Sequence, residues 1–131
     1  MIGLDTNILV RYIVEDDPLQ LRKATECIEQ HLTERNYGFI STVVIAEIAW
    51  VLESVYGFTH TEIAAAIERI LQIELLVVEH EAEVFLAMVA LKRKHGAFAD
   101  ALIGGINTKA GCSRTVTFDR KALRLPGFEL L

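Results

Sequence analysis

The chain has few of the residues that mark disulfide-bonded, zinc-binding or disordered proteins. It holds two cysteines and two prolines in 131 residues, while 52% of its residues are hydrophobic. Such an apolar composition argues against a disordered chain. Two distant cysteines argue against a disulfide framework or a cysteine zinc site. We therefore expect Cys27 and Cys112 to be small residues of the core.

Long apolar runs are missing as well. No segment reaches the roughly 18 residues that a membrane-spanning helix needs. The start shows no basic segment followed by a hydrophobic signal region. We therefore expect a cytoplasmic protein without a membrane partner. A chain of 131 residues fits one domain over residues 1–131, which buries about two thirds of the surface of the unfolded chain.

Basic residues are scarce in most of the chain and gather in its last third. Residues 1–91 hold 5 Lys and Arg against 15 Asp and Glu, whereas residues 92–131 hold 8 against 3. The net charge of −5 thus divides into −10 for the first part and +5 for the second. Basic residues beside acidic ones suit a site that attracts a polyanion and also holds a cation. Ordinary solvated helix faces would give the same composition.

Short strand-like runs alternate with helical patterns along the whole chain. Apolar runs predict strands near residues 2–4, 39–41, 75–78 and 114–118, and helical periodicity fills the segments between them. This alternation predicts a single α/β domain with a mostly parallel sheet.

Several helices are marked by their ends or by their apolar faces. Pro18 after Asp17 predicts a helix start, and Thr59 with Glu62 forms the pattern of a capping box. The helix that follows Ser41 is apolar around most of its circumference, so we expect it to be buried. A further helix is predicted over residues 81–95, with Phe85 among its inward residues.

Four carboxylates stand where predicted strands end or helices begin. Asp5 follows the first strand, Asp119 follows the last, Asp100 opens a helix, and Glu47 lies on the most apolar helix. Ligands of open α/β sheets bind at the carboxyl ends of the strands, so these acids converge if the first and last predicted strands are neighbours. Each acid also has a structural alternative. Asp5 can cap a helix, Asp100 suits a helix dipole, and Glu47 can face water.

Carboxylates that share one crevice require a cation. At surface-like dielectric they repel by roughly 1 to 4 kcal/mol per pair, so some stay protonated or a divalent metal enters. Oxygen ligands without a nearby set of His or Cys select Mg²⁺ or Mn²⁺, and the four histidines show no ligand spacing. A carboxylate-held pair of such ions activates water for phosphoester displacement. The predicted reaction is hydrolysis of a phosphodiester.

These residues also resemble the PIN-domain ribonucleases, and the order of elements resembles the VapC toxins of prokaryotic toxin–antitoxin pairs. The motifs are Asp5-Thr6-Asn7, Glu47 in Val-Val-Ile-Ala-Glu-Ile, Asp100 in Phe-Ala-Asp-Ala-Leu-Ile, and Thr117-Phe118-Asp119. The resemblance implies a three-layer α/β/α fold and endoribonuclease activity on an RNA substrate with Mg²⁺, for which Mn²⁺ can substitute. It also implies a homodimer and inhibition by a cognate antitoxin whose tail occupies the active-site groove.

The resemblance assigns roles to individual residues of this sequence. The acidic quartet that would bind metal and catalyse cleavage is Asp5, Glu47, Asp100 and Asp119. Asn7 and Thr117 match the polar supports of the quartet. Ala97 stands where many relatives carry a further acid, which argues against a second, tightly held metal ion. Arg11 fits a basic position of the group, although a surface ion pair is the alternative.

The basic last third adds Lys94 and Arg120 as predicted contacts to the RNA backbone. Two other functions remain open. A haloacid-dehalogenase-like phosphatase needs an Asp two residues after Asp5, where this chain has Asn7. A binding module without activity would not need the four acids, all of which are present. The sequence does not name the RNA that is cut, because single-stranded loops are recognised by shape and stacking.

Overall fold

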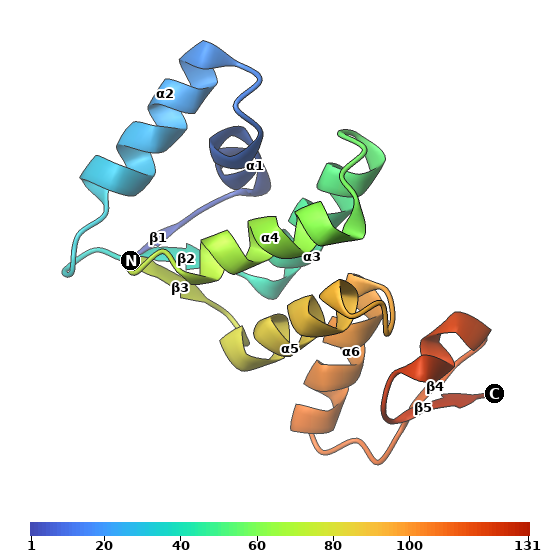
Figure 1. Ribbon diagram of the computed structural model, residues 1–131. Helices are drawn as coiled ribbons and strands as arrows, with labels where there is room; N and C mark the ends of the chain where they lie inside the picture. The colour runs from blue at the N-terminus through green and yellow to red at the C-terminus, as the bar shows by residue number, and fades with distance from the viewer.

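The computed structural model describes residues 1–131 and contains six α-helices and five short strands (Figure 1). The helices are α1 (Thr6–Val14), α2 (Pro18–Glu26), α3 (Thr42–Ser54), α4 (His60–Leu71), α5 (Glu81–Lys92) and α6 (Phe98–Lys109). The strands are β1 (Ile2–Gly3), β2 (Gly38–Ile40), β3 (Leu76–Val78), β4 (Thr115–Thr117) and β5 (Phe128–Leu130). A π-helical turn, η1 (Cys27–His31), extends α2, and a 3-10 turn, η2 (Arg120–Arg124), joins β4 to β5. None of the helices has the length and apolar character that crossing a membrane would require.

The strands form two separate sheets, and every pair in them is parallel. The first sheet has the order β1-β2-β3, and the second consists of β4 and β5 alone. Figure 1 shows the two sheets apart, with α5 and α6 drawn between them. The condition under which the acids would converge, that the first and last predicted strands are neighbours, is not met in this structure, because β1 pairs only with β2 and β4 only with β5. Strand β5 is not among the four strands that the sequence predicts.

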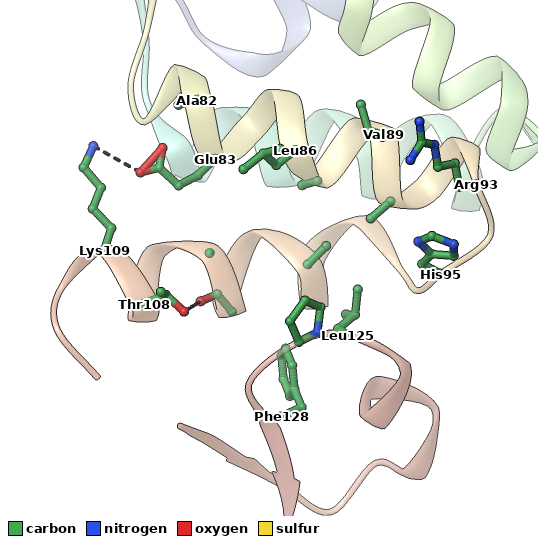
Figure 2. Close-up of a pocket in the computed structure, with 16 residues that line it drawn as sticks. Ala82, Glu83, Leu86, Val89, Arg93, His95, Thr108, Lys109, Leu125 and Phe128 are labelled. Atoms are coloured by element: carbon green, nitrogen blue, oxygen red, sulfur yellow. Dashed lines mark hydrogen bonds and ion pairs between the residues drawn. The ribbon is translucent and has the colours of Figure 1, made fainter. Parts of the chain in front are cut away.

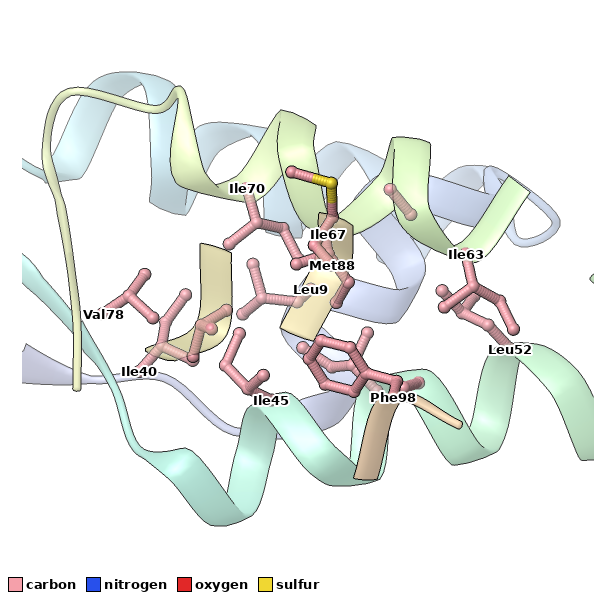
Figure 3. Packing of buried hydrophobic residues seen from close by; sticks show 14 of the residues in the cluster. Leu9, Ile40, Ile45, Leu52, Ile63, Ile67, Ile70, Val78, Met88 and Phe98 are labelled. Atoms are coloured by element: carbon pink, nitrogen blue, oxygen red, sulfur yellow. The ribbon is translucent and has the colours of Figure 1, made fainter. Parts of the chain in front are cut away.

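The main core lies between the first sheet and the helices that pack against it. Twenty-one buried hydrophobic residues form one cluster. Figure 3 shows Ile40 and Val78 of the sheet close to side chains from several helices, among them Leu9, Ile67 and Phe98. Each such side chain contributes about 1.5 to 3 kcal/mol when it is fully buried. Sheets and helices together make the three-layer α/β/α fold that the sequence predicts.

Two helix starts confirm the predictions from their caps. The carboxylate of Asp17 accepts hydrogen bonds from the backbone N–H groups of Leu19 and Gln20, both at 3.1 Å. The Thr59 hydroxyl accepts from the Glu62 N–H at 3.2 Å, and the Glu62 carboxylate accepts from the Thr59 N–H at 3.1 Å. Such caps stabilise a helix by about 0.5 to 2 kcal/mol each.

Three predictions of burial are wrong. Helix α3 is buried on one side only, because Val43, Glu47 and Trp50 lie on an exposed face at helical spacing. Phe85 of α5 is 50% exposed. Cys112 is exposed in the turn that follows α6, whereas Cys27 is partly buried. Periodicity alone does not tell which apolar faces meet a neighbour and which do not.

The second sheet is held against α6 by two contacts that depend on glycine. A Cβ atom at Gly104 of α6 would lie 2.6 Å from the ring of Phe128, and one at Gly96 would lie 2.8 Å from the side chain of Leu125. Figure 2 shows Phe128 and Leu125 next to α6. Because these approaches leave no room for a side chain, Gly104 lets β5 pack closely on α6, and Gly96 lets Leu125, at the end of η2, pack closely on the loop before α6.

Two adjacent glycines of α6 test this contact. A Cβ at Gly105 would meet Glu83 at an ordinary 3.5 Å. Gly105→Ala should therefore raise the free energy of unfolding by about 0.5 to 1 kcal/mol, because Ala is favoured in a helix. Gly104→Ala should lower it by about 1 to 3 kcal/mol, because the Phe128 ring must move. Urea denaturation of both variants measures the difference, and equal stability of the two would show that the Phe128 contact does not matter.

Candidate functional site

Asp100 and Asp119 line one cavity of about 710 Å³. The walls come from the start of α4, the loop before α6, the first turn of α6 and the turn η2. Its lining residues are His60, Lys94, Gly96, Ala97, Asp100, Asp119, Arg120, Lys121 and Arg124. The two carboxylates thus share the cavity with four Lys and Arg side chains. This is the combination of acids and bases that the sequence predicts for a site that takes a polyanion and a cation.

The carboxylate of Asp119 is positioned by its own backbone neighbours. Asp119 ends the segment after β4 and caps η2, where its Oδ1 accepts from the Lys121 N–H at 2.9 Å. The Asp119 N–H donates to the Thr117 hydroxyl at 3.0 Å. Thr117 therefore shapes the turn that carries Asp119, although it does not itself line the cavity.

Asp100 lies in the first turn of α6, where the negative charge suits the helix dipole. Its pKa is nevertheless raised, first by burial and then by the negative charge of Asp119. No Lys or Arg forms an ion pair with it. The ionised form of Asp100 is thus disfavoured in the protein alone, and a nearby cation would reverse that preference.

The other two predicted acids lie outside this cavity. Asp5 caps α1, with its Oδ1 accepting from the Thr6 N–H at 2.8 Å, which is the structural alternative that the sequence allows. Glu47 is on the exposed face of α3. No group of three or more His, Cys, Asp or Glu side chains lies close enough to hold a metal ion. The structure therefore brings together two of the four predicted acids, Asp100 and Asp119.

Of the other predicted site residues, some line the cavity and some lie outside it. Lys94 and Arg120 line the cavity with the acids. Arg11 instead forms an ion pair with Asp16 at 2.9 Å, donates to Gln20 at 2.6 Å and donates to the Tyr56 hydroxyl at 2.7 Å. This is the surface ion pair that the sequence leaves open for Arg11. Asn7 is exposed in the first turn of α1.

His60 lines the cavity with the acids, although no pattern in the sequence predicts it there. His60 opens α4, and its Nε2 lies 3.9 Å from a carboxylate oxygen of Glu53. No spacing in the sequence links it to Asp100, because only the packing of α4 brings it to the cavity. Lys121 and Arg124 belong to the basic last third, and η2 turns both toward the same space.

A second cavity of about 570 Å³ lies between α5, α6 and β5 (Figure 2). Its walls are mostly apolar and include Leu86, Val89 and Phe128. Its acid, Glu83, is paired with Lys109 at 3.2 Å. None of the predicted acids reaches it, so the cavity of Asp100 and Asp119 is the better candidate for chemistry.

Comparison with known proteins identifies one family. A family model described as the PIN domain matches residues 2–127, a range that includes Asp5, Glu47, Asp100 and Asp119. No curated protein and no solved structure matches the chain.

The coupling between the two carboxylates can be measured directly. Asp119→Asn should lower the pKa of Asp100, because it removes a negative charge that raises it. Carboxyl carbon NMR gives the titration midpoint. The pKa of Asp100 is higher in the folded protein than in the unfolded chain. Its contribution to stability is therefore fully present at pH values below the unfolded pKa, and that contribution is lost as the pH rises through the folded pKa. Glu129→Gln, which removes a charge from β5, should leave the midpoint unchanged. An unchanged midpoint in Asp119→Asn would show that the two carboxylates do not interact.

Proposed function

Because the chain belongs to the PIN domain family, whose members are generally metal-requiring nucleases, we propose that it is an endoribonuclease that hydrolyses RNA phosphodiester bonds. The cofactor is Mg²⁺, and Mn²⁺ can substitute. The observation that carries the proposal is the cavity in which Asp100 and Asp119 face Lys94, Arg120 and two further basic side chains. Cleavage of RNA by such a nuclease uses both acidic and basic side chains. The basic side chains bind the anionic backbone, and the carboxylates bind the metal ion.

The donor chemistry of the cavity fits a hard divalent cation. Carboxylate oxygens are the ligands that Mg²⁺ and Mn²⁺ prefer, and Asp100 forms no ion pair with a Lys or Arg side chain. Asp100 and Asp119 would hold the ion. Asp5 and Glu47 are the other two acids of the proposed quartet, although both lie outside the cavity of Asp100 and Asp119 in this structure. When bound, the ion supplies an activated water and charge stabilisation of the leaving oxygen.

The residues of the chain have separate tasks in this reaction. Lys94 and Arg120 bind phosphates of the RNA and orient its backbone in the cavity. Thr117 and the Lys121 N–H keep the Asp119 carboxylate in place. Asn7 is proposed to support Asp5 in the same way. Arg11 binds RNA only if its guanidinium leaves Asp16 and Tyr56.

We further propose that the protein is the toxin of a type II toxin–antitoxin pair, acting in the cytoplasm as a homodimer. The resemblance to VapC toxins along the whole chain supports this role. The basic rim of the cavity suits an acidic antitoxin tail, which would occupy the groove and exclude RNA. A haloacid-dehalogenase-like phosphatase is disfavoured by Asn7 and by the PIN family match, and a binding module without activity by the presence of all four acids.

Single acid-to-amide changes test the catalytic assignment. Asp100→Asn should lower the cleavage rate by more than about 100-fold, because loss of a second-shell partner of a metal already costs 10- to 100-fold. Its melting temperature without metal should not fall, since a like charge is removed. Mn²⁺ should raise the melting temperature of the wild type and not that of Asp100→Asn.

Glu74→Gln is the matched control, because Glu74 is exposed and lies outside the cavity. It should keep both the activity and the response to Mn²⁺. Cleavage by Asp100→Asn at the wild-type rate under saturating Mg²⁺ would refute the catalytic role of this carboxylate.

The basic rim of the cavity predicts how RNA binding depends on salt. Reversing the charges of Lys94 and Arg120 together should weaken RNA binding. It should also reduce the magnitude of the slope of log affinity against log salt by about 1 to 2, because two phosphate contacts are lost. Mn²⁺ affinity of the same variant must stay normal, because Arg120 adjoins Asp119.

The control reverses Lys23 and Arg35, two exposed basic residues outside the cavity. This control variant changes the net charge by the same amount as the reversal of Lys94 and Arg120. It should leave the slope of log affinity against log salt nearly unchanged. Equal slopes for the two double variants would place the RNA on another surface.

A further inference from the structure

Three aromatic side chains of the chain are exposed, and one of them adjoins the candidate site. Exposed fractions are 50% for Phe85, 65% for Trp50 and 81% for Phe118. Phe118 directly precedes Asp119, which lines the cavity. Single exposed apolar side chains are common on protein surfaces, so exposure alone does not define a site. The charges around each ring distinguish the three.

Phe118 lies in a basic segment, whereas the other two rings lie beside acids. Residues 114–124 hold four Lys and Arg and one Asp, a net charge of +3. Trp50 lies one turn from two Glu residues of α3, and Phe85 follows the first turn of α5, which holds two Glu. Only Phe118 therefore combines an exposed aromatic face with basic surroundings.

Hydrogen bonds on both sides hold the turn that carries Phe118. The Thr117 hydroxyl accepts from the Asp119 N–H at 3.0 Å, and the Thr117 carbonyl accepts from the Leu131 N–H at 2.9 Å. The Asp119 Oδ1 accepts from the Lys121 N–H at 2.9 Å. The backbone under the ring is thus fixed before any partner binds, which lowers the entropy that binding would cost.

We propose that the ring of Phe118 stacks against an unpaired base of the RNA while neighbouring phosphates lie in the cavity. This role rests on the proposed nuclease function and adds a base-binding residue to it. Proteins that bind single strands combine basic groups, which hold the backbone, with aromatic rings on which bases stack. The base of a paired nucleotide is already stacked inside its helix, so the ring takes an unpaired one.

A strand of a partner protein is the other occupant that an exposed apolar side chain could accept. The buried centre of a protein interface is depleted of charged residues, lysine among them. Phe118 is followed directly by Asp119, Arg120 and Lys121, all of them exposed. Burial of these charges together with the ring would be costly unless each found a partner. A stacked base leaves them in water, where the two basic side chains meet phosphates, so the base fits this surface better.

Binding in the absence of cleavage tests the stacking. In a buffer with EDTA, filter binding measures the affinity for an oligoadenosine of about ten nucleotides. Phe118→Ala should weaken this affinity about 5- to 150-fold, the effect of losing one base–aromatic stack. Phe118→Trp, which keeps an aromatic face, should bind at least as tightly as the wild type.

The matched control is Phe85→Ala, which removes an exposed ring outside the cavity. It should bind oligoadenosine as the wild type does. Wild-type affinity in Phe118→Ala would overturn the proposal.

An abasic chain separates stacking from an indirect effect on the turn. A ribose-phosphate chain of the same length offers phosphates without bases. Phe118→Ala should bind it as tightly as the wild type does, because there is no base to stack. Reversal of Lys94 and Arg120 should instead weaken the binding of both ligands. If Phe118→Ala weakened both ligands equally, Phe118 would act only by shaping the turn of Asp119, and the proposal would fail.

Phe118→Leu distinguishes a base from an apolar partner surface. Leucine keeps an apolar side chain and lacks the aromatic face. Binding of oligoadenosine by Phe118→Leu should therefore fall nearly as far as in Phe118→Ala. Wild-type affinity in Phe118→Leu would assign the ring to a simple apolar contact, such as a strand of a partner protein, and would refute stacking.

Kinetics separate this role from the chemistry of the carboxylates. Under saturating Mg²⁺, Phe118→Ala should raise KM for a single-stranded RNA and change kcat little, because a stacked base binds equally in the ground state and the transition state. A fall in kcat with KM unchanged would place Phe118 in the cleavage step and contradict the proposal. An inactive wild type would refute the nuclease function alone, since the binding measurements without metal still decide the stacking.

Discussion

The close packing of Phe128 on Gly104 and of Leu125 on Gly96 holds β5 and the end of η2 against α6 and the loop before it. Because β5 and η2 are tied to α6, Asp119 is carried to the start of the same helix and meets Asp100.

Local features of the fold follow from the sequence because they depend on neighbouring residues. Asp17 with Pro18, and Thr59 with Glu62, mark helix starts through hydrogen bonds that span two or three residues. Features that depend on distant partners do not follow in this way. The exposed face of α3 and the pairing of β4 with β5 are decided by which surfaces find a neighbour, and apolar periodicity carries no such information.

The candidate site shows the same division. The sequence places Asp100 and Asp119 at element boundaries within a basic segment, and the structure brings them together with Lys94 and Arg120. His60 joins them through tertiary packing alone. Asp5 and Glu47 match the same pattern equally well, yet they lie elsewhere in the chain. A motif fixes the chemistry of a residue, whereas its distance from a second motif is set by the whole fold.

The exposed face of α3 gives the protein an optical property. Trp50, the only tryptophan of the chain, is 65% exposed and lies one turn from Glu47 on that face. The emission of an indole moves to shorter wavelength when water around it is replaced by protein or nucleic acid. The fluorescence of the unlabelled protein therefore reports on the surface that carries Glu47, separately from the cavity of Asp100 and Asp119, which contains no aromatic side chain other than the imidazole of His60.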